Sequence, residues 1–229
     1  MRPFVFARTL AVGALAAACC ACAPAARPTS PSSAGPQPLA PAEVREYKGQ
    51  KLGSVDDFFE NSIKGPQVVD RTKYRLTVSG DVTSQTVYTY GEVLALRPAY
   101  TKVVQLDCVE GWSVKLLWEG VKVADLLDQA GVRKGAKTVV VHAVDGYTTS
   151  VPLDYIRSKD ILMAYKMNGI EIPTKRGFPF MLVAEDKWGY KWCKWIDRIE
   201  ASTDTDYKGY WEQRGYSTGG DRDKPSIGP

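Results

Sequence analysis

Short strand-forming runs separated by turn residues dominate this chain from Tyr74 onward. The run 138–143 is apolar and rich in β-branched residues, and Asp145-Gly146 separates it from a second strand-like run. Asn168-Gly169 separates another pair of runs in the same way. Because Asp-Gly and Asn-Gly fit the tight turns that join antiparallel strands, these dipeptides predict two β-hairpins. The chain is therefore constrained to a fold in which neighbouring strands pair.

Two short helices are expected between the strands. Thr89 and Glu92 have the spacing of a capping box, and Pro98 ends the helix that they begin. A second helix covers residues 123–130, with Gly131 as its stop. Further strand-like runs lie at 74–80, 102–107, 180–184 and 194–201. This pattern predicts an α+β domain, mostly β, with mixed sheets and short helices over residues 43–216.

The first 22 residues have the pattern of an export signal. Arg2 and Arg8 supply positive charge, and the apolar run 10–18 is too short to span a bilayer. A small-residue run that ends at Cys19 resembles a bacterial lipoprotein processing site, and ordinary cleavage near Ala23 is the alternative. We expect an exported protein, periplasmic or in the cell envelope, that is lipid-anchored if Cys19 is processed.

The two flanks of the domain have polar or small residues. Residues 23–42 are rich in Pro, Ala and Ser, which predicts a disordered tether. Residues 217–229 are expected to form a frayed tail. The net charge of +4 is too small to indicate a nucleic-acid partner.

Cysteine and histidine are scarce beyond the leader. Only Cys108 and Cys193 of the five cysteines lie in the folded part, and in an exported protein such a pair allows a disulfide. The lone histidine, His142, excludes a multi-histidine metal site, and we expect it to be a structural residue of a strand. The chain has no haem-attachment motif and no iron–sulfur cysteine set.

Cys108 opens the segment Cys-Val-Glu-Gly-Trp-Ser at the end of a strand-like run. Irregular segments at strand ends often line sites, and a thiolate is a soft ligand for a redox-active metal. The segment resembles the metal-cysteine segment of the sulfite oxidase-like molybdopterin oxidoreductases. It is closer to the periplasmic sulfoxide reductase branch than to true sulfite oxidases, in which an arginine-rich stretch follows the cysteine. The resemblance covers about residues 43–216, and it implies the sulfite oxidase fold with Cys108 as a molybdenum ligand.

The same resemblance gives roles to the neighbours of the cysteine. It implies that Glu110 lies near the open face of the metal, where a carboxylate relays a proton; the alternative is a solvated loop glutamate. Trp112 is either a wall of the pocket or part of the core. In the segment 60–66, which resembles the lead-in of compact members, Asn61 is expected to reach the cofactor.

Gly189-Tyr190-Lys191 matches an element of the family that holds the phosphate end of the pterin. Gly189 allows close backbone approach, and lysine binds phosphate as a point charge. Lys194 is expected to assist. Interleaved aromatic and lysine residues also suit single-stranded nucleic acid, which export and the low net charge argue against, or an edge strand protected by lysines.

The segment 173–182 departs from the family pattern. Arg176 stands where the family has His or Asn, and Met181 stands where it has an arginine. We expect Arg176 to support the pterin phosphate from this neighbouring position. Thr148, in another family-like segment, is expected to bond to the pterin.

These features predict an exported oxidoreductase that depends on molybdenum-molybdopterin. The reaction would be a two-electron oxygen-atom transfer, with reduction of a small oxide such as a sulfoxide as the expected direction. Electrons would come from a separate electron-transfer protein, with a membrane haem protein as one candidate. The alternative is a non-catalytic lipoprotein module, for binding or as an accessory subunit, that keeps the fold without the cofactor. The loss of the arginine at Met181 favours this alternative.

Overall fold

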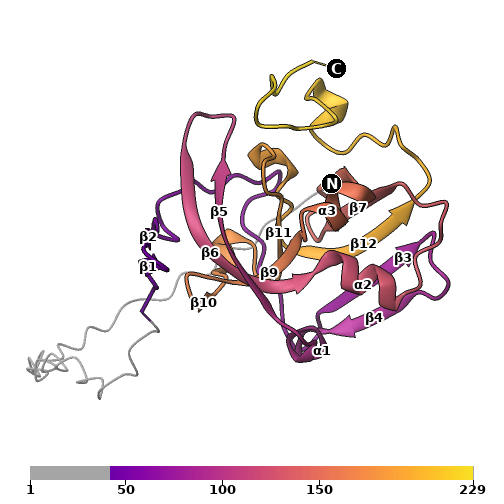
Figure 1. The fold of residues 1–229 in the computed structure, drawn as a ribbon, viewed down its shortest axis with the longest axis horizontal. Helices are drawn as coiled ribbons and strands as arrows, with labels where there is room; N and C mark the ends of the chain where they lie inside the picture. Colours follow the sequence, from indigo (N-terminus) through magenta and orange to yellow (C-terminus); the bar gives the residue numbers. More distant parts are fainter. Residues whose placement is uncertain (1–41, 229) are drawn as a thin grey trace, which may run out of the picture. The chain divides into compact units, whose positions relative to one another are not determined.

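The computed structural model describes residues 42–228 (Figure 1). The predicted export signal, the lipoprotein site and almost all of the predicted tether lie outside the described residues. Within residues 42–228, no helix has both the length and the apolar character needed to cross a membrane.

The first five-stranded sheet contains the strand that leads to Cys108. Its strands run in the order β10-β9-β6-β5, and β11 also pairs with β9. All of these pairs are antiparallel. The strands are β5 (Tyr100–Asp107), β6 (Ser113–Lys122), β9 (Leu162–Met167), β10 (Ile170–Glu171) and β11 (Met181–Val183).

The second five-stranded sheet has the order β4-β3-β12-β7-β8. Its central pair, β3 and β12, is parallel and joins segments from opposite ends of the domain, whereas the other pairs are antiparallel (Figure 1). The strands are β3 (Arg75–Gly80), β4 (Thr86–Thr89), β7 (Thr138–Ala143), β8 (Thr148–Pro152) and β12 (Ile196–Ser202).

Short elements complete the fold. A small hairpin, β1 and β2, precedes the two sheets, and helices connect their strands. These elements are β1 (Glu46–Tyr47), β2 (Gln50–Lys51), α1 (Tyr90–Ala95), α2 (Val123–Gln129), α3 (Leu153–Ser158) and the 3₁₀ turns η1 (Thr174–Arg176), η2 (Gly189–Lys191) and η3 (Glu212–Arg214).

The local signals in the sequence are confirmed. Asn168 and Gly169 have φ angles of 49° and 79°, as the tight turn between β9 and β10 requires. Asn168 also donates its side-chain amide to the Gly53 carbonyl at 2.8 Å, which ties the N-terminal segment to this sheet. Thr89 and Glu92 form the predicted capping box of α1. The prediction of a mostly β, α+β domain with mixed sheets is correct.

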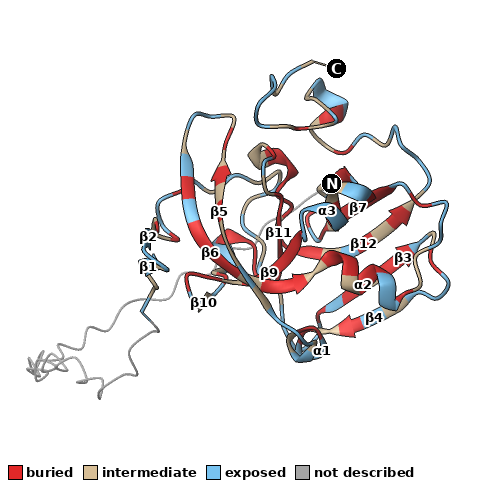
Figure 2. Cartoon of the chain, in the orientation of Figure 1, coloured by how far each residue is buried: buried red, intermediate tan, exposed pale blue. Residues whose placement is uncertain are grey.

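The sequence analysis missed β6, the ten-residue strand that pairs with both β5 and β9. Its side chains alternate over Val114, Leu116 and Trp118, all of which are buried. That period-two pattern is a strand signal that was available in the sequence. Figure 2 shows buried residues along β6, β9 and β11, where the core lies.

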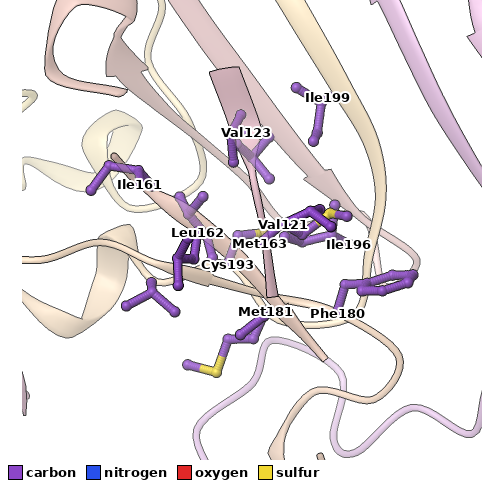
Figure 3. Close-up of a cluster of buried hydrophobic side chains, with 14 of the residues drawn as sticks. Val121, Val123, Ile161, Leu162, Met163, Phe180, Met181, Cys193, Ile196 and Ile199 are labelled. Atoms are coloured by element: carbon purple, nitrogen blue, oxygen red, sulfur yellow. The ribbon is translucent and has the colours of Figure 1, made fainter. Parts of the chain in front are cut away.

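Cys193 belongs to this core. Its side chain is fully buried and packs with Met163, Leu162 and Met181 in the cluster that Figure 3 shows. Burial raises the pKa of the Cys193 thiol well above its ordinary value. The residue is therefore a small apolar core side chain rather than a reactive group.

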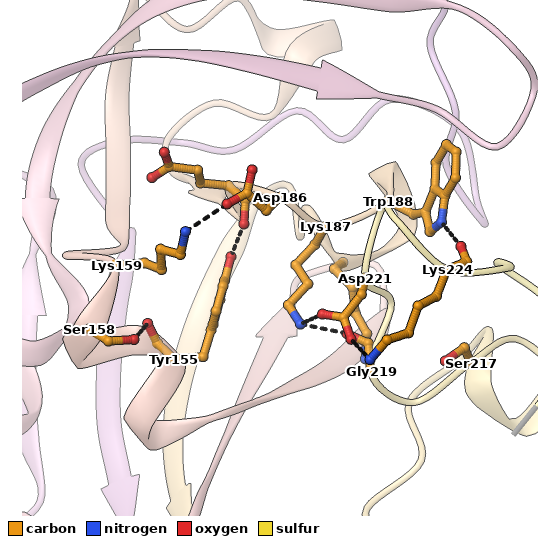
Figure 4. Close-up of polar contacts among 12 residues, drawn as sticks. Tyr155, Ser158, Lys159, Asp186, Lys187, Trp188, Ser217, Gly219, Asp221 and Lys224 are labelled. Carbon is orange, nitrogen blue, oxygen red and sulfur yellow. Dashed lines mark hydrogen bonds and ion pairs between the residues drawn. The ribbon is translucent and has the colours of Figure 1, made fainter.

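The segment beyond residue 216 is not a frayed tail, contrary to our expectation, because it packs on the η2 turn (Figure 4). The backbone N–H of Trp188 donates to the Gly220 carbonyl at 2.8 Å, and the Trp188 indole donates to the Lys224 carbonyl at 3.0 Å. The buried Lys187 ammonium pairs with Asp221. These partners come from distant parts of the chain, so composition alone did not reveal them.

His142, on β7, makes a structural contact as expected. Its Nε2 lies 2.9 Å from Glu200 Oε2, and the Arg198 guanidinium lies 2.9 Å from its Nδ1. Burial first, and Arg198 second, lower the pKa of His142 below its ordinary value of 6.5, although Glu200 and Asp197 oppose them. The folded protein therefore takes up a proton at His142 less readily than the unfolded chain does.

This difference predicts that the free energy of unfolding falls as the pH falls through about 6.5, because the unfolded state binds the proton first. Urea unfolding of the wild type and of His142→Gln between about pH 7.5 and 5.5 measures the effect, and in this window histidine is the main side chain that titrates. The free energy of unfolding of His142→Gln should depend less steeply on pH than that of the wild type. An equal dependence in both proteins would contradict the prediction.

Candidate functional site

Cys108 is the first residue after β5, in a turn that is held by its own backbone hydrogen bonds. The Cys108 N–H donates to the Trp112 carbonyl at 2.9 Å, and the Gly111 N–H donates to the Cys108 carbonyl at 3.1 Å. Gly111 has a φ of 88°, a conformation that glycine adopts without strain. This turn places the thiol, 8% exposed, in the wall of a cavity of about 220 Å³.

The structure brings the second predicted segment to the same place. Trp188, just before η2, forms a parallel bridge with Asp107, just before the thiol. A Cβ atom on Gly189 would lie 3.4 Å from the Asp107 carbonyl oxygen and from the Cys108 Cα. The η2 backbone at Gly189 therefore lies within van der Waals distance of the cysteine turn. Gly189 and Tyr190, which the sequence analysis assigned to the cofactor, both line the cavity.

Glu110 lies beside the thiol at the cavity wall. Its Oε2 is 3.8 Å from Cys108 Sγ and accepts a hydrogen bond from the Trp112 indole at 3.0 Å. Asn61 first, and Trp112 second, hold the pKa of Glu110 below its ordinary value. Burial raises the pKa of the Cys108 thiol. A carboxylate and a protonated thiol thus share this part of the cavity.

Lys194 is the one cation among the lining residues that the structure describes. Its ammonium donates to Glu60 at 2.9 Å and to the backbone carbonyl of Asn61. Burial lowers the pKa of Lys194, although the contact with Glu60 opposes that shift. Asn61 and Lys194, two residues predicted for the site from distant segments, therefore meet at the cavity.

A hydroxyl without a partner belongs to another residue of the cavity wall. Ser62 lines the cavity, and its Oγ atom is buried without a hydrogen-bond partner among the described residues. A buried hydroxyl that lacks a hydrogen bond costs free energy, which a bound polar molecule can recover. The sequence analysis did not single out Ser62.

Lys191 does not line the cavity. Its side chain is fully buried, and its ammonium lies 2.5 Å from Glu212 Oε1 and 2.9 Å from the Ser150 carbonyl oxygen. Burial lowers the pKa of Lys191, whereas Glu212 opposes the shift. Thr149 donates to the same Glu212 oxygen at 2.8 Å. In this arrangement Lys191 holds the C-terminal segment, and Lys194 is the lysine that reaches the cavity.

Arg176 and Thr148 also lie outside the cavity lining. The guanidinium of Arg176 is 4.2 Å from the centre of the Phe58 ring and 3.7 Å from Asp56. Its Nε is buried without a partner among residues 42–228. Thr148 accepts a hydrogen bond from the Tyr210 N–H at its backbone carbonyl. Met181, at the position of the missing arginine, does line the cavity, with a 2% exposed side chain.

Most of the remaining wall is aromatic, and of these residues the sequence analysis named only Trp112 and Tyr190 for the site. These side chains come from the N-terminal segment, from the cysteine turn, from the turn after β7, from the η2 region and from the segment before and after η3. They are Phe58, Phe59, Trp112, Tyr147, Tyr190, Trp192, Trp195, Trp211 and Tyr216. The concentration of Trp and Tyr in 187–195 and 207–216 was the available signal.

The disulfide alternative for Cys108 is wrong. Cys108 and Cys193 are both free cysteines and both buried. Cys193 packs in the core, whereas Cys108 lines the cavity. The two thiols therefore occupy different environments, and Cys108 is the one open to a ligand.

Comparison with known proteins places the chain in one family of oxidoreductases. The model of the family "Oxidoreductase molybdopterin binding domain" matches residues 63–211. "Uncharacterized oxidoreductase YuiH" of Bacillus subtilis is 35% identical over 157 residues, which cover 68% of this chain and 78% of that protein.

A second relative is named "Protein-methionine-sulfoxide reductase catalytic subunit MsrP" and comes from Burkholderia mallei. It is 28% identical, and the match covers 72% of this chain but only 56% of that protein. The solved structure of the sulfane dehydrogenase SoxCD from Paracoccus pantotrophus superposes with a TM-score of 0.60 at 22% identity, covering 68% of this chain and 43% of that one. The predicted sulfite oxidase-like fold is confirmed.

The buried pair Lys191–Glu212 yields a stability prediction. Glu212→Gln should lower the free energy of unfolding by about 3–5 kcal/mol, because a buried ammonium then loses its counter-charge. Replacing both Lys191 and Glu212 by methionine should lower the free energy of unfolding by less than the sum of the two single replacements.

Lys159→Met is the matched control, since it removes the exposed Lys159–Asp186 pair of Figure 4, whose atoms lie 2.7 Å apart. It should cost less than about 1 kcal/mol. Urea unfolding measures all of these variants. A cost for Glu212→Gln as small as the control's would show that the pair is not desolvated.

Proposed function

The chain belongs to the oxidoreductase molybdopterin-binding domain family, and from that premise we propose that Cys108 ligates the molybdenum of an enzyme that reduces a small sulfoxide. The molybdenum-molybdopterin cofactor follows from the family. The sulfoxide direction draws support from the relative named as a methionine-sulfoxide reductase. This chain spans little more than half of that relative, so the substrate is our inference.

One observation carries the proposal: a free thiol lines the cavity with a carboxylate oxygen 3.8 Å away. A thiolate suits a soft metal, and a neighbouring carboxylate suits proton transfer to a departing oxygen. The core thiol of Cys193 has neither a cavity nor such a neighbour. Cys108 is therefore the one candidate for the metal-binding thiol in the described part of the chain.

The residues around the thiol fit an anionic, polar cofactor. Ser62 offers a hydroxyl without a partner, and Lys194 offers a cation at the wall. The backbone at Gly189 lies against the cysteine turn. We assign cofactor contacts to these residues and to Asn61 and Tyr190. Lys191 and Arg176 would act indirectly, the first through η2 and the second through Phe58.

The reaction takes up protons as well as electrons. A sulfoxide, two protons and two electrons give a thioether and water, so the sulfur is reduced and the oxygen leaves as water. When bound, the cofactor supplies the two-electron chemistry. The electrons would come from a separate electron-transfer protein, for which a haem protein of the membrane is the candidate. Glu110, oriented by the Trp112 indole, would carry protons to the oxygen that leaves.

The non-catalytic module is the second candidate. Its support is that Met181 gives the cavity an apolar side chain where the family has an arginine, and that Lys191 and Arg176 lie outside the lining. Such a module would keep Cys108 as an inert thiol and bind no molybdenum. The metal content of the purified protein separates the two candidates.

Cys108→Ser should lower sulfoxide reduction at least about 100-fold, because even outer-shell partners of metal ligands account for 10–100-fold. The free energy of unfolding of the apoprotein should change by less than about 1 kcal/mol. Cys193→Ala is the matched control, because it removes a thiol from the core and should retain the metal. Unchanged turnover in Cys108→Ser would refute the ligand role.

We also propose export and lipid anchoring, which rest on Arg2, Arg8 and the small-residue run before Cys19. Cys19→Ala should move the protein from the membrane fraction to a soluble exported fraction, as detected by cell fractionation and immunoblotting. Cys20→Ala is the control that should leave the protein at the membrane. Equal distribution of the wild type and Cys19→Ala would favour ordinary cleavage near Ala23.

A further inference from the structure

An exposed phenylalanine lies at the cavity beside the reactive turn. Phe59 lines the cavity and is 70% exposed, more than any other aromatic among the large exposed apolar residues. An exposed ring contributes little to folding, whereas exposed apolar surface at a cavity often marks a contact for a ligand. Phe59 therefore needs an explanation other than core packing.

The ring of Phe59 is part of an ordered aromatic group. It meets Trp112 edge-on, with ring centroids 6.3 Å apart and an interplanar angle of 67°. Buried Phe58 stacks on Trp112 at 5.8 Å and 24°. The Trp112 indole is fixed further by its hydrogen bond to Glu110. Phe58 and Glu110 thus hold Trp112 in place, and Trp112 and Phe59 together present apolar ring surface next to Cys108.

The charges around this cavity disfavour an oxyanion as the substrate. Lys194 is the one lining cation in the described residues, and it is already paired with Glu60. Asp145 and Glu110 add carboxyl groups to the wall. Sites that bind oxyanions use Arg or Lys side chains. In residues 42–228 the cavity lining holds no cation besides Lys194, which the proposed function assigns to the cofactor, so none is left for an oxyanion substrate.

We propose that Phe59 and Trp112 form a specificity-determining aromatic clamp, which binds the apolar flank of a neutral organic sulfoxide beside Cys108. This inference rests on the proposed function and deepens it, because it names the part of the substrate that is recognised. A sulfoxide with an aryl or extended thioether flank contacts both rings. Dimethyl sulfoxide lacks such a flank, and sulfite is a charged oxyanion.

The test compares two neutral substrates in the molybdenum-loaded full chain, with a reduced viologen dye as the electron donor. The ratio of kcat/KM for methyl phenyl sulfoxide to that for dimethyl sulfoxide should fall about 3- to 10-fold in Phe59→Ala, the factor that one aromatic contact provides. The change should lie mainly in KM, because the ring binds the flank and does not take part in the chemistry. Phe59→Tyr should keep most of the ratio.

Two controls keep the interpretation specific. Val68→Ala removes apolar surface from a residue that is 90% exposed and outside the cavity lining, so it should leave the ratio unchanged. Methyl phenyl sulfide, the thioether product, should inhibit competitively, with an inhibition constant that rises about 3- to 10-fold in Phe59→Ala. This readout reports binding of the flank rather than turnover.

The outcomes are distinguishable. An unchanged ratio and an unchanged inhibition constant in Phe59→Ala, with both sulfoxides still reduced, would overturn the clamp and leave the proposed function standing. A wild type that contains molybdenum but reduces neither sulfoxide would overturn the proposed function itself. A loss of the preference for methyl phenyl sulfoxide in Phe59→Ala alone, with Val68→Ala like the wild type, is the result expected.

Discussion

The close approach of two backbone turns is the constraint on which the site depends. The parallel bridge between Asp107 and Trp188 fixes the end of β5 against the start of η2. Gly189 lies at this contact, where a Cβ atom would meet the Asp107 carbonyl oxygen and the Cys108 Cα at 3.4 Å, so the two turns are in van der Waals contact. The thiol, the η2 backbone and the lysine that follows it come from distant segments, and this one contact gives them a common cavity. The tail beyond residue 216 then packs on the outer side of η2 and holds it there.

Features that depend on neighbours in the sequence could be predicted, and features that depend on distant partners could not. The capping box at Thr89 and the turn at Asn168 are determined within a few residues, and both were found. The sequence alone could not decide between Lys191 and Lys194 as the cation of the cavity. That choice depends on Glu212, which takes up the Lys191 ammonium inside the protein. The packed tail was missed for the same reason, since its partners are Lys187 and Trp188 rather than its own residues.

The positive side chains near the cavity are largely satisfied within the protein. Lys191 pairs with Glu212, Lys194 pairs with Glu60, and the Arg176 guanidinium lies over Phe58. These contacts stabilise the walls. Because the carboxylates also neutralise the lysine charges, the cavity attracts anions less strongly. A cofactor phosphate would compete with Glu60 for Lys194. Met181 adds an apolar side chain to the same wall.

Cys108 combines two properties that conflict in an ordinary cysteine, since it is 8% exposed and still lines a cavity. Burial raises its pKa, which keeps the group a protonated thiol when no cation is near. Thiols resist oxidation better than thiolates do, an advantage in an oxidising compartment. A metal ion offsets the desolvation of the thiolate and releases the proton. The surroundings of Cys108 thus favour a protonated thiol at a cavity wall, whereas Cys193 packs in the hydrophobic core.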